Sequence, residues 1–134
     1  FGSWLRELRP DYLPAETGMD RFVSYNKPVD CIGKEAAAAE KSAGPARTLC
    51  AFAVDAVDAD VVADEPIFDG DTVVGFVTSG GYAHYSQQSV ALGFVPTEMA
   101  TAGRAFTIEI LGDRRPATII TTPLVDADGS RMRG

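Results

Sequence analysis

Two neighbouring apolar runs constrain the fold of this chain more than any other feature. Residues 73–77 (V-V-G-F-V) and 89–96 (S-V-A-L-G-F-V-P) are rich in β-branched side chains, and they flank a T-S-G-G break and a short polar, aromatic bend. β-Branched and aromatic residues favour strands. Gly80-Gly81 lies where a strand would bend sharply or carry a bulge. We therefore predict two strands here, the first of them bent.

The same strand pattern extends over most of the chain. Apolar residues recur with a period of two from Thr48 onward, as half-buried strands require. Asp69-Gly70 and Gly112-Asp113 are candidates for tight hairpin turns. Short strands at such regular spacing indicate a mainly β fold, a small antiparallel six-stranded barrel or Greek key. The predicted strands are 48–54, 66–69, 73–84, 88–95, 105–111 and 114–122.

The first third of the chain has a different character. We expect residues 1–46 to be a connector that ends a preceding domain, and residues 47–134 to be the barrel domain. Leu5, Leu8 and Tyr12 have the spacing of one short helical turn, which the nearby prolines would end. These apolar side chains would pack on a neighbouring structure.

One short strand and one short helix are predicted within this connector. Residues 21–25 alternate as a strand does. Residues 33–41 contain four consecutive alanines, which favour a helix, and Asp30 could cap its start. Gly44-Pro45 would end the helix. An alanine-rich helix of this length buries little area, so docking has to stabilise it.

Composition restricts the function. The chain has 134 residues with 46% apolar content, enough for one globular domain. Its net charge of −7 argues against nucleic acid as a partner. Two cysteines and one histidine are too few for a zinc site, and they favour reduced thiols. No apolar run approaches a membrane span, and no signal-peptide layout is present. Because the chain starts at Phe1 without a methionine, we expect a piece of a longer polypeptide.

The patterns for catalysis and metal binding are weak. The acidic residues between Asp55 and Glu65 lack the glycine turn of a calcium loop, so a solvated loop is expected. Ser79 and His84 could be drawn into a triad, but T-S-G-G is not a nucleophile elbow. His84 is expected at the rim of the barrel. Gly80-Gly81 lacks the spacing of a phosphate-binding loop. We therefore expect no catalytic residue and no metal ligand in this chain.

Three arginines are candidates for binding a small anionic or aromatic ligand. Arg21 could stack on a heterocycle or grip a carboxylate. It could instead be a surface arginine paired with Asp20 or Glu16. Arg131 and Arg133 could hold a ligand carboxylate, or the tail that carries them could fray into solvent.

Several blocks resemble one family in consistent order. Residues 14–19 (P-A-E-T-G-M) and 30–36 (D-C-I-G-K-E-A) resemble the connector P-x-E-x-G-L…D-F-I-G-K-E-A of the glycine-cleavage T-protein family. Residues 74–80 and 90–96 resemble the C-terminal barrel of that family. The blocks L-R-E-L-R-P-D-Y and P-L-V, near the two ends, are closer still to dimethylglycine and sarcosine dehydrogenases, whose C-terminal half is a T-protein-like module.

The resemblance implies a role in one-carbon metabolism. In these flavoproteins an FAD domain oxidises an N-methyl amine, and the iminium reacts with tetrahydrofolate to give 5,10-methylenetetrahydrofolate. Folate lies at the centre of a three-part ring, and the C-terminal barrel closes one side. The catalytic aspartate and the FAD site belong to upstream segments, so this chain alone is expected to be inactive.

The resemblance also implies two cofactor-binding residues. Arg21 matches a position at which relatives contact folate, usually with Tyr or Trp. Arg131, or alternatively Arg133, corresponds to a family arginine near the C-terminus. Cys31 replaces the usual Phe, and Gln87-Gln88 replaces the commoner Gly-Lys.

The expected function is therefore that of a fragment of a folate-dependent dimethylglycine or sarcosine dehydrogenase. The alternatives are a fragment of a stand-alone aminomethyltransferase and a docking barrel that uses Trp4, Leu5, Leu8 and Tyr12. Its expected partners are the flavin and folate domains of its own polypeptide and a small N-methyl amine. The expected location is the cytoplasm, or alternatively the mitochondrial matrix.

Overall fold

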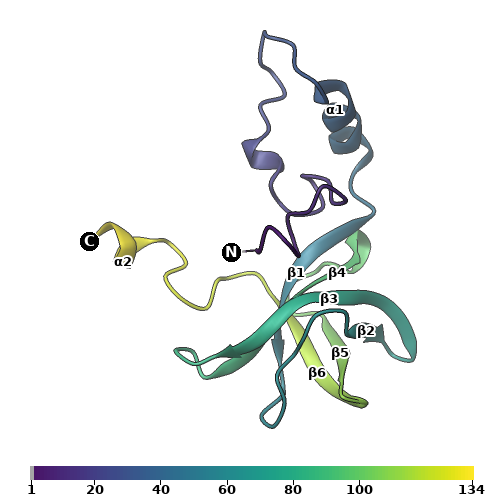
Figure 1. The fold of residues 1–134 in the computed structure, drawn as a ribbon, viewed down its shortest axis with the longest axis vertical. Helices are drawn as coiled ribbons and strands as arrows, with labels where there is room; N and C mark the ends of the chain where they lie inside the picture. The colour runs from purple at the N-terminus through teal and green to yellow at the C-terminus, as the bar shows by residue number, and fades with distance from the viewer. Residues whose placement is uncertain (1) are drawn as a thin grey trace.

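The computed structural model describes residues 2–134, and six strands in it close into a barrel from which other segments project (Figure 1). All six strands predicted for the barrel are present within two residues of their expected bounds. The strands are β1 (Arg47–Val54), β2 (Pro66–Asp69), β3 (Thr72–Ala83), β4 (Gln88–Pro96), β5 (Ala105–Ile110) and β6 (Asp113–Ile120).

The barrel has the order β1-β4-β3-β2-β5-β6, and β6 pairs back with β1. Every neighbouring pair is antiparallel. Consecutive hairpins join β2, β3 and β4, and β4 lies beside β1, which is a Greek-key arrangement. The predicted small antiparallel six-stranded barrel is confirmed.

Two hairpin turns were predicted, and one is displaced by a residue. Gly70 takes a left-handed φ of 59° between β2 and β3, as expected. The turn between β5 and β6 uses Leu111-Gly112, with φ of 52° and 91°, and Asp113 already belongs to β6. A two-residue turn with both φ values positive matches the twist of antiparallel strands.

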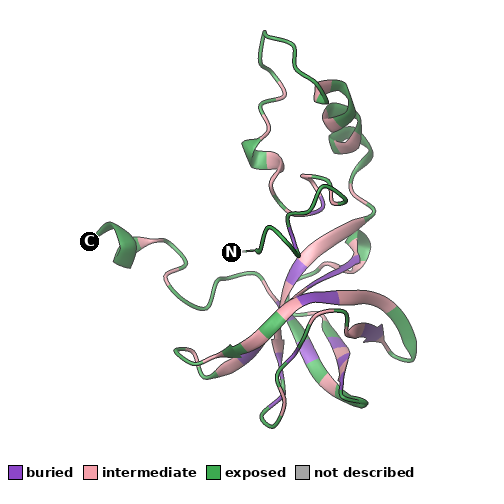
Figure 2. Ribbon diagram, viewed as in Figure 1, coloured by how far each residue is buried: buried purple, intermediate pink, exposed green. Residues whose placement is uncertain are grey.

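The core fills the inside of the barrel. Phe52, Ile67, Val77 and Ile108 are fully buried. The rings of Phe52 and Phe106 meet edge to face at 5.9 Å. Figure 2 shows that buried residues concentrate in the strands, whereas the projecting segments are mostly exposed or half-buried.

Glycines let β3 and β4 approach closely. A Cβ on Gly75 would lie 1.9 Å from the carbonyl oxygen of Phe94, and a Cβ on Gly93 would lie 2.7 Å from that of Phe76. Phe76 and Phe94 are partners in the strand register. The two apolar runs thus each supply a glycine at the same contact between backbones.

The predicted bend in β3 is present, but its position differs. The register between β3 and β4 shifts between Val77 and Ser79, two residues before the predicted Gly80-Gly81. Gly80 has another role, because a Cβ there would lie 2.7 Å from the Cβ of Val61 in the loop before β2. A larger residue would push this loop away from the barrel.

Residues 20–44, which we call the arm, project from the barrel (Figure 1). The arm contains the 3₁₀ helix η1 (Asp20–Phe22) and the helix α1 (Lys34–Ala43). The predicted strand at 21–25 is therefore wrong. The chain reverses at Gly18, with φ of 69°, and no strand in the described residues pairs with this stretch. Alternation alone cannot make a strand without a neighbour.

Helix α1 confirms the predicted helix, but its predicted cap is wrong. The helix begins one residue late, after Gly33 in a left-handed conformation, and no side chain caps it. The Asp30 carboxylate accepts a hydrogen bond from the backbone of Cys31 instead, at 2.9 Å. Gly44 ends the helix as predicted.

Residues 121–134, which we call the tail, leave β6 and end in a second short helix that the sequence did not predict. This helix is α2 (Ser130–Arg133). The Asp126 carboxylate accepts hydrogen bonds from the backbone of Arg131 at 2.8 Å and of Met132 at 3.2 Å. Neither α1 nor α2, the two α-helices of the described part of the chain, is long or apolar enough to cross a membrane.

Candidate functional site

A buried carboxylate joins the N-terminal segment (residues 2–19) to the barrel. The Glu7 side chain is fully buried. It accepts hydrogen bonds from the backbone N–H of Ser3 and from the Ser79 hydroxyl, the latter at 2.7 Å. The turn that presents Glu7 is the helical turn predicted from the leucine spacing, with the amide of Glu7 bonded to the carbonyl of Ser3 at 2.9 Å. Glu7 itself was not predicted.

Glu7 is held in its charged form. Burial by itself raises the pKa of the Glu7 carboxyl, but hydrogen bonds from Thr78, Ser79 and the backbone of Ser3 outweigh burial and lower the pKa below its ordinary value. The single proton of the Thr78 hydroxyl goes to the carbonyl oxygen of Leu92 at 3.0 Å. The hydrogen bonds that the structure places on the carboxylate come from Ser79 and from the Ser3 amide. At neutral pH the contact is charge-assisted.

A second contact fixes the N-terminal segment further along β1 and β4. The ring of Tyr12 packs on that of Phe94 at 4.5 Å, and the Arg47 guanidinium lies 4.9 Å from the Tyr12 ring. Arg47 Nε also donates to the Glu16 carboxylate at 2.8 Å. The Glu16 carbonyl accepts from the backbone N–H of Leu49 at 2.7 Å. Residues 2–19 are thus bound to the outer face of the barrel at several points.

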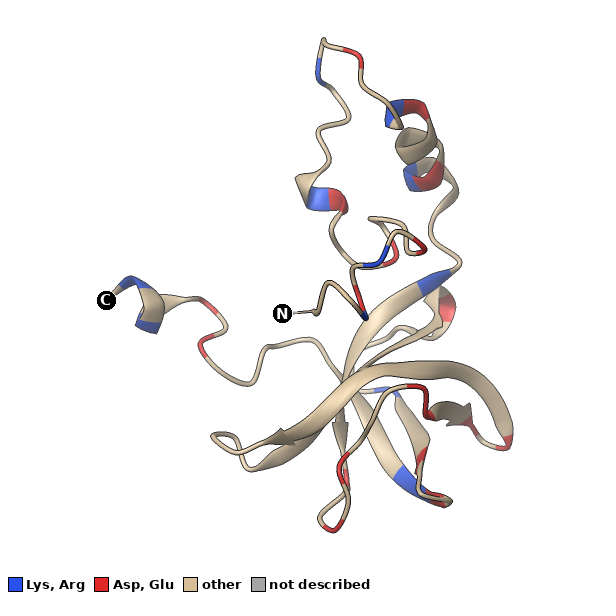
Figure 3. Ribbon diagram, in the orientation of Figure 1, with Lys and Arg blue, Asp and Glu red and all other residues tan. Residues whose placement is uncertain are grey.

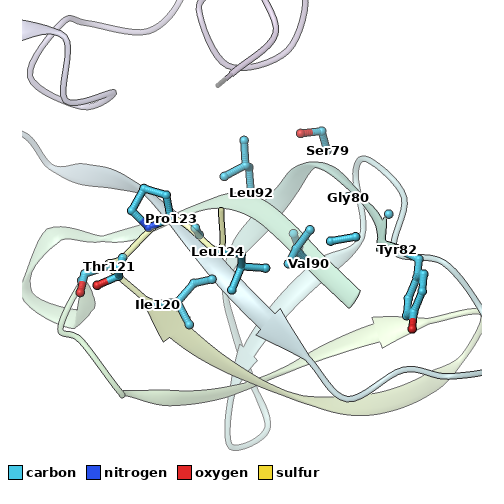
Figure 4. A pocket seen from close by; sticks show the side chains of 14 residues that line it. Ser79, Gly80, Tyr82, Val90, Leu92, Ile120, Thr121, Pro123 and Leu124 are labelled. Atoms are coloured by element: carbon cyan, nitrogen blue, oxygen red, sulfur yellow. The ribbon is translucent and has the colours of Figure 1, made fainter. Parts of the chain in front are cut away.

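A groove of about 590 Å³ lies on the outer face of the barrel beside this segment (Figure 4). Its lining is mainly apolar: Ala51 comes from β1, Leu92 from β4, Ile120 from β6 and Leu124 from the tail. Ser79, whose hydroxyl donates to the Glu7 carboxylate, also lines the groove. The groove therefore lies next to the contact between Glu7 and the barrel.

The structure separates Arg21 from both acidic partners considered for it. Asp20 lies 3.9 Å from the Lys41 ammonium, and Glu16 pairs with Arg47. The Arg21 guanidinium lies 4.7 Å from the ring of Phe22, and its side chain is exposed. Arg21 therefore presents a planar cation at the surface of the arm.

Arg131 is exposed, but its side chain contacts the bend between β3 and β4. Its guanidinium donates to the hydroxyl of Tyr85 at 2.8 Å and lies 5.3 Å from that ring. Arg133 donates to the carbonyl oxygen of Asp128 within the tail. Arg21 belongs to η1 in the arm and Arg131 to α2 in the tail, and the arm and the tail project from the barrel as separate segments (Figures 1 and 3).

The other sequence candidates do not assemble a site. Ser79 is bonded to Glu7, whereas His84 packs edge-on against the ring of Tyr82 at 5.0 Å, so no triad forms. In the acidic loop, Asp58 pairs with Arg115 at 3.1 Å. Residues 2–134 contain no cluster of metal-ligating side chains.

The domain is a closed six-stranded antiparallel barrel, and polar contacts bind its N-terminal segment to the outer face of the barrel. Residues 47–126 match the glycine cleavage T-protein C-terminal barrel domain, and the chain belongs to that family. Its structure superposes on glycine cleavage system aminomethyltransferase T from Bartonella henselae with a TM-score of 0.80 at 24% identity, over 88% of this chain and 33% of that one.

Curated relatives extend the similarity to almost the whole chain. It is 39% identical over 133 residues to mitochondrial dimethylglycine dehydrogenase of Mus musculus, and this alignment covers 99% of this chain and 15% of that protein. It is 30% identical over 119 residues to an aminomethyltransferase of Bacillus pumilus, and this alignment covers 88% of this chain and 32% of that protein. The chain therefore spans only a minor part of the length of these relatives.

Proposed function

We propose that this chain is the C-terminal part of a folate-dependent, FAD-linked dimethylglycine or sarcosine dehydrogenase, and that it helps to enclose tetrahydrofolate. The observation that carries the proposal is the similarity to dimethylglycine dehydrogenase over 99% of the chain, which includes the N-terminal segment and the arm. The partners are then the flavin and folate domains of the same polypeptide and a small N-methyl amine. The location is the cytoplasm or the mitochondrial matrix.

The residues of this chain fit a supporting role toward folate. Bound tetrahydrofolate supplies the amine nitrogens that take up the one-carbon unit. Arg21 offers an exposed planar cation that can stack on an aromatic ring or bind a carboxylate. Arg131 offers a second guanidinium whose position is fixed by Tyr85. The buried Glu7 is not a candidate for binding folate, because its carboxylate is enclosed and accepts hydrogen bonds from within the chain.

Tetrahydrofolate binding by the full-length polypeptide and by this chain alone tests the proposal. We expect the full-length protein to bind tetrahydrofolate and to form 5,10-methylenetetrahydrofolate from dimethylglycine or sarcosine. The isolated chain should bind folate much more weakly. Equal affinity would contradict a shared site. A full-length protein without flavin would favour the stand-alone aminomethyltransferase, and one with neither flavin nor folate binding would favour a docking barrel.

Replacement of Arg21 by alanine in the full-length protein should weaken tetrahydrofolate binding by about 1–3 kcal/mol, the range for a hydrogen bond to a charged group. Isothermal titration measures the change. Lys27→Ala is the matched control, because it removes another exposed positive charge from the arm. Unaltered affinity in Arg21→Ala would remove Arg21 from the site.

Replacement of Arg131 by alanine should weaken binding of a glutamyl-bearing folate by about 1–3 kcal/mol for the same reason. The corresponding pteroate, which lacks the glutamate carboxylates, should bind Arg131→Ala and the parent protein alike. Arg133→Ala is the control, since Arg133 is bonded to Asp128 within the tail. An equal loss for both ligands would assign Arg131 to the tail structure and not to the carboxylates.

A further inference from the structure

The tail has little packing that could fix its position. It projects from the end of β6 (Figure 1). None of residues 121–134 is buried, and the helix α2 has only four residues. A segment without buried side chains keeps one position only where specific polar contacts hold it. The position of the tail therefore depends on a small number of such contacts.

The end of the tail is a compact unit held together by its own aspartates. The Asp126 carboxylate accepts a hydrogen bond from the backbone N–H of Arg131 at 2.8 Å. The Arg133 guanidinium donates to the carbonyl oxygen of Asp128. Both bonds lie within residues 126–133, so they give this unit its shape but do not attach it to the barrel.

One residue outside the tail holds this unit. Arg131 donates from Nη1 to the Tyr85 hydroxyl at 2.8 Å, and the guanidinium carbon lies 5.3 Å from the centre of the Tyr85 ring. Among residues 2–134, no other hydrogen bond, ion pair or cation–π contact joins residues 126–134 to the rest of the chain. The contact between Tyr85 and Arg131 therefore fixes the end of the tail.

Tyr85 stands on a well-paired part of the barrel. It lies in the bend between β3 and β4, directly beyond the register pair of Ala83 and Gln88. The amide of Ser86 donates to the carbonyl oxygen of Ala83 at 3.1 Å and closes this bend. The Tyr85 side chain is 73% exposed, so burial in the core does not explain an aromatic residue at this place. Its contact with Arg131 does.

This contact leaves most of the Arg131 guanidinium available to a ligand. The group has five N–H donors, and the Tyr85 hydroxyl accepts from one nitrogen, Nη1. No acidic side chain in the described part of the chain forms an ion pair with Arg131. A carboxylate can accept two parallel hydrogen bonds from a guanidinium. An acidic partner would have neutralised the arginine, whereas the neutral Tyr85 fixes its position and leaves its charge.

We infer that Tyr85 is the positioning residue of Arg131: its hydroxyl holds the tail so that Arg131 can bind a ligand carboxylate without the tail first becoming ordered. An arginine on an unattached tail would have to be ordered at each binding event, and this ordering lowers affinity. The inference rests on the proposed function, because it takes Arg131 as a folate-binding residue. Tyr85 acts through Arg131 and does not touch the ligand.

Tyr85→Phe in the full-length protein tests the inference, because it keeps the ring beside Arg131 and removes only the hydroxyl. We expect isothermal titration to show about three- to tenfold weaker binding of tetrahydrofolate, which bears a glutamyl group. The corresponding pteroate, which lacks the glutamate carboxylates, should bind the variant and the parent protein alike. His84→Ala is the matched control, since His84 is an exposed neighbour that packs on Tyr82 and not on the tail.

Two further measurements separate positioning from a structural role. Trypsin cleavage after Arg131 without ligand reports the attachment of the tail, and it should be faster in Tyr85→Phe because the guanidinium is released. The double variant Tyr85→Phe, Arg131→Ala should bind tetrahydrofolate no more weakly than Arg131→Ala, since a positioning residue acts only through its partner.

Four results would overturn the inference. The first is unchanged tetrahydrofolate affinity in Tyr85→Phe when Arg131→Ala binds more weakly. The second is an equal loss for tetrahydrofolate and the pteroate. The third is an additional loss in the double variant, which would make Tyr85 a ligand contact or a structural residue. The fourth is an unchanged rate of cleavage after Arg131.

Failure of the proposed function gives a different result. Arg131→Ala would then leave tetrahydrofolate affinity unchanged, or the parent protein would not bind tetrahydrofolate, and the inference would fall with the proposed role of Arg131. A loss in Arg131→Ala without a loss in Tyr85→Phe contradicts the inference alone.

Discussion

Replacement of Gly75 by alanine is expected to destabilise the barrel by about 3 kcal/mol or more, at the upper end of the range for overpacked sites. The new Cβ would lie 1.9 Å from the carbonyl oxygen of Phe94, and that oxygen belongs to backbone in a paired strand. A rotamer change cannot relieve such a clash, so β3 and β4 would have to separate. Chemical denaturation followed by circular dichroism measures the loss in free energy of unfolding.

Val73→Ala is the control for Gly75→Ala, since Val73 lies on the same strand and is mostly exposed. This change should stay within about 0.5 kcal/mol, as for ordinary surface positions. Gly93→Ala should resemble Gly75→Ala with a smaller loss, because its closest backbone contact is 2.7 Å. A Gly75→Ala protein with unchanged stability would show that the two strands have room to move apart.

Replacement of Glu7 by alanine is expected to cost about 3 kcal/mol, because each of the two donors left without a partner costs about 1–3 kcal/mol. These donors are the Ser79 hydroxyl and the Ser3 amide. The N-terminal segment should detach while the barrel stays folded, so limited proteolysis near Leu5 would accompany the loss of stability. Glu98→Ala, at an exposed glutamate, should have little effect. Resistance to proteolysis equal to that of the parent chain would contradict the anchoring role.

The same contact should make the stability of the chain dependent on pH in the acid range. Because the pKa of Glu7 is lower in the folded chain than its ordinary value of 4.5, its contribution is fully present above that value and is lost as the pH falls through the folded pKa. Glu7→Gln should remove this part of the acid dependence. A parent chain and a Glu7→Gln chain with parallel stability profiles below pH 4.5 would show that the carboxylate is not responsible.

Most of the barrel could be predicted because alternation along a strand reflects the two faces of a closed sheet. The arm could not be predicted as well. Residues 21–25 alternate in the same way, but no strand among residues 2–134 pairs with them, and the chain forms η1 instead. The division of the chain at residues 46 and 47 stays a prediction. The contacts of Glu7 and Tyr12 show that residues 2–19, which belong to the predicted connector, pack directly on the barrel.

The site was less predictable than the fold. Glu7 stands in the stretch L-R-E-L-R, where an acidic residue between two arginines indicates a solvated surface. Its burial depends on Ser79, which is distant in the chain. The groove likewise joins Ala51, Leu92 and Leu124, and no local pattern links them. Arg21 and Arg131 were candidates from the chemistry of a guanidinium and from the family resemblance, and their roles stay predictions.

The ring of strands is closed unevenly. β1 and β4 share eight residue pairs, whereas β2 and β5 share only Ile67 with Ile108 and Phe68 with Thr107. We therefore expect thermal fluctuations to separate β2 from β5 before any other pair of strands. An opening there would turn the cylinder into a curved ribbon with two bare edges, to which a second chain could add a strand. The short seam makes this the point where self-association of a damaged or overheated domain would start.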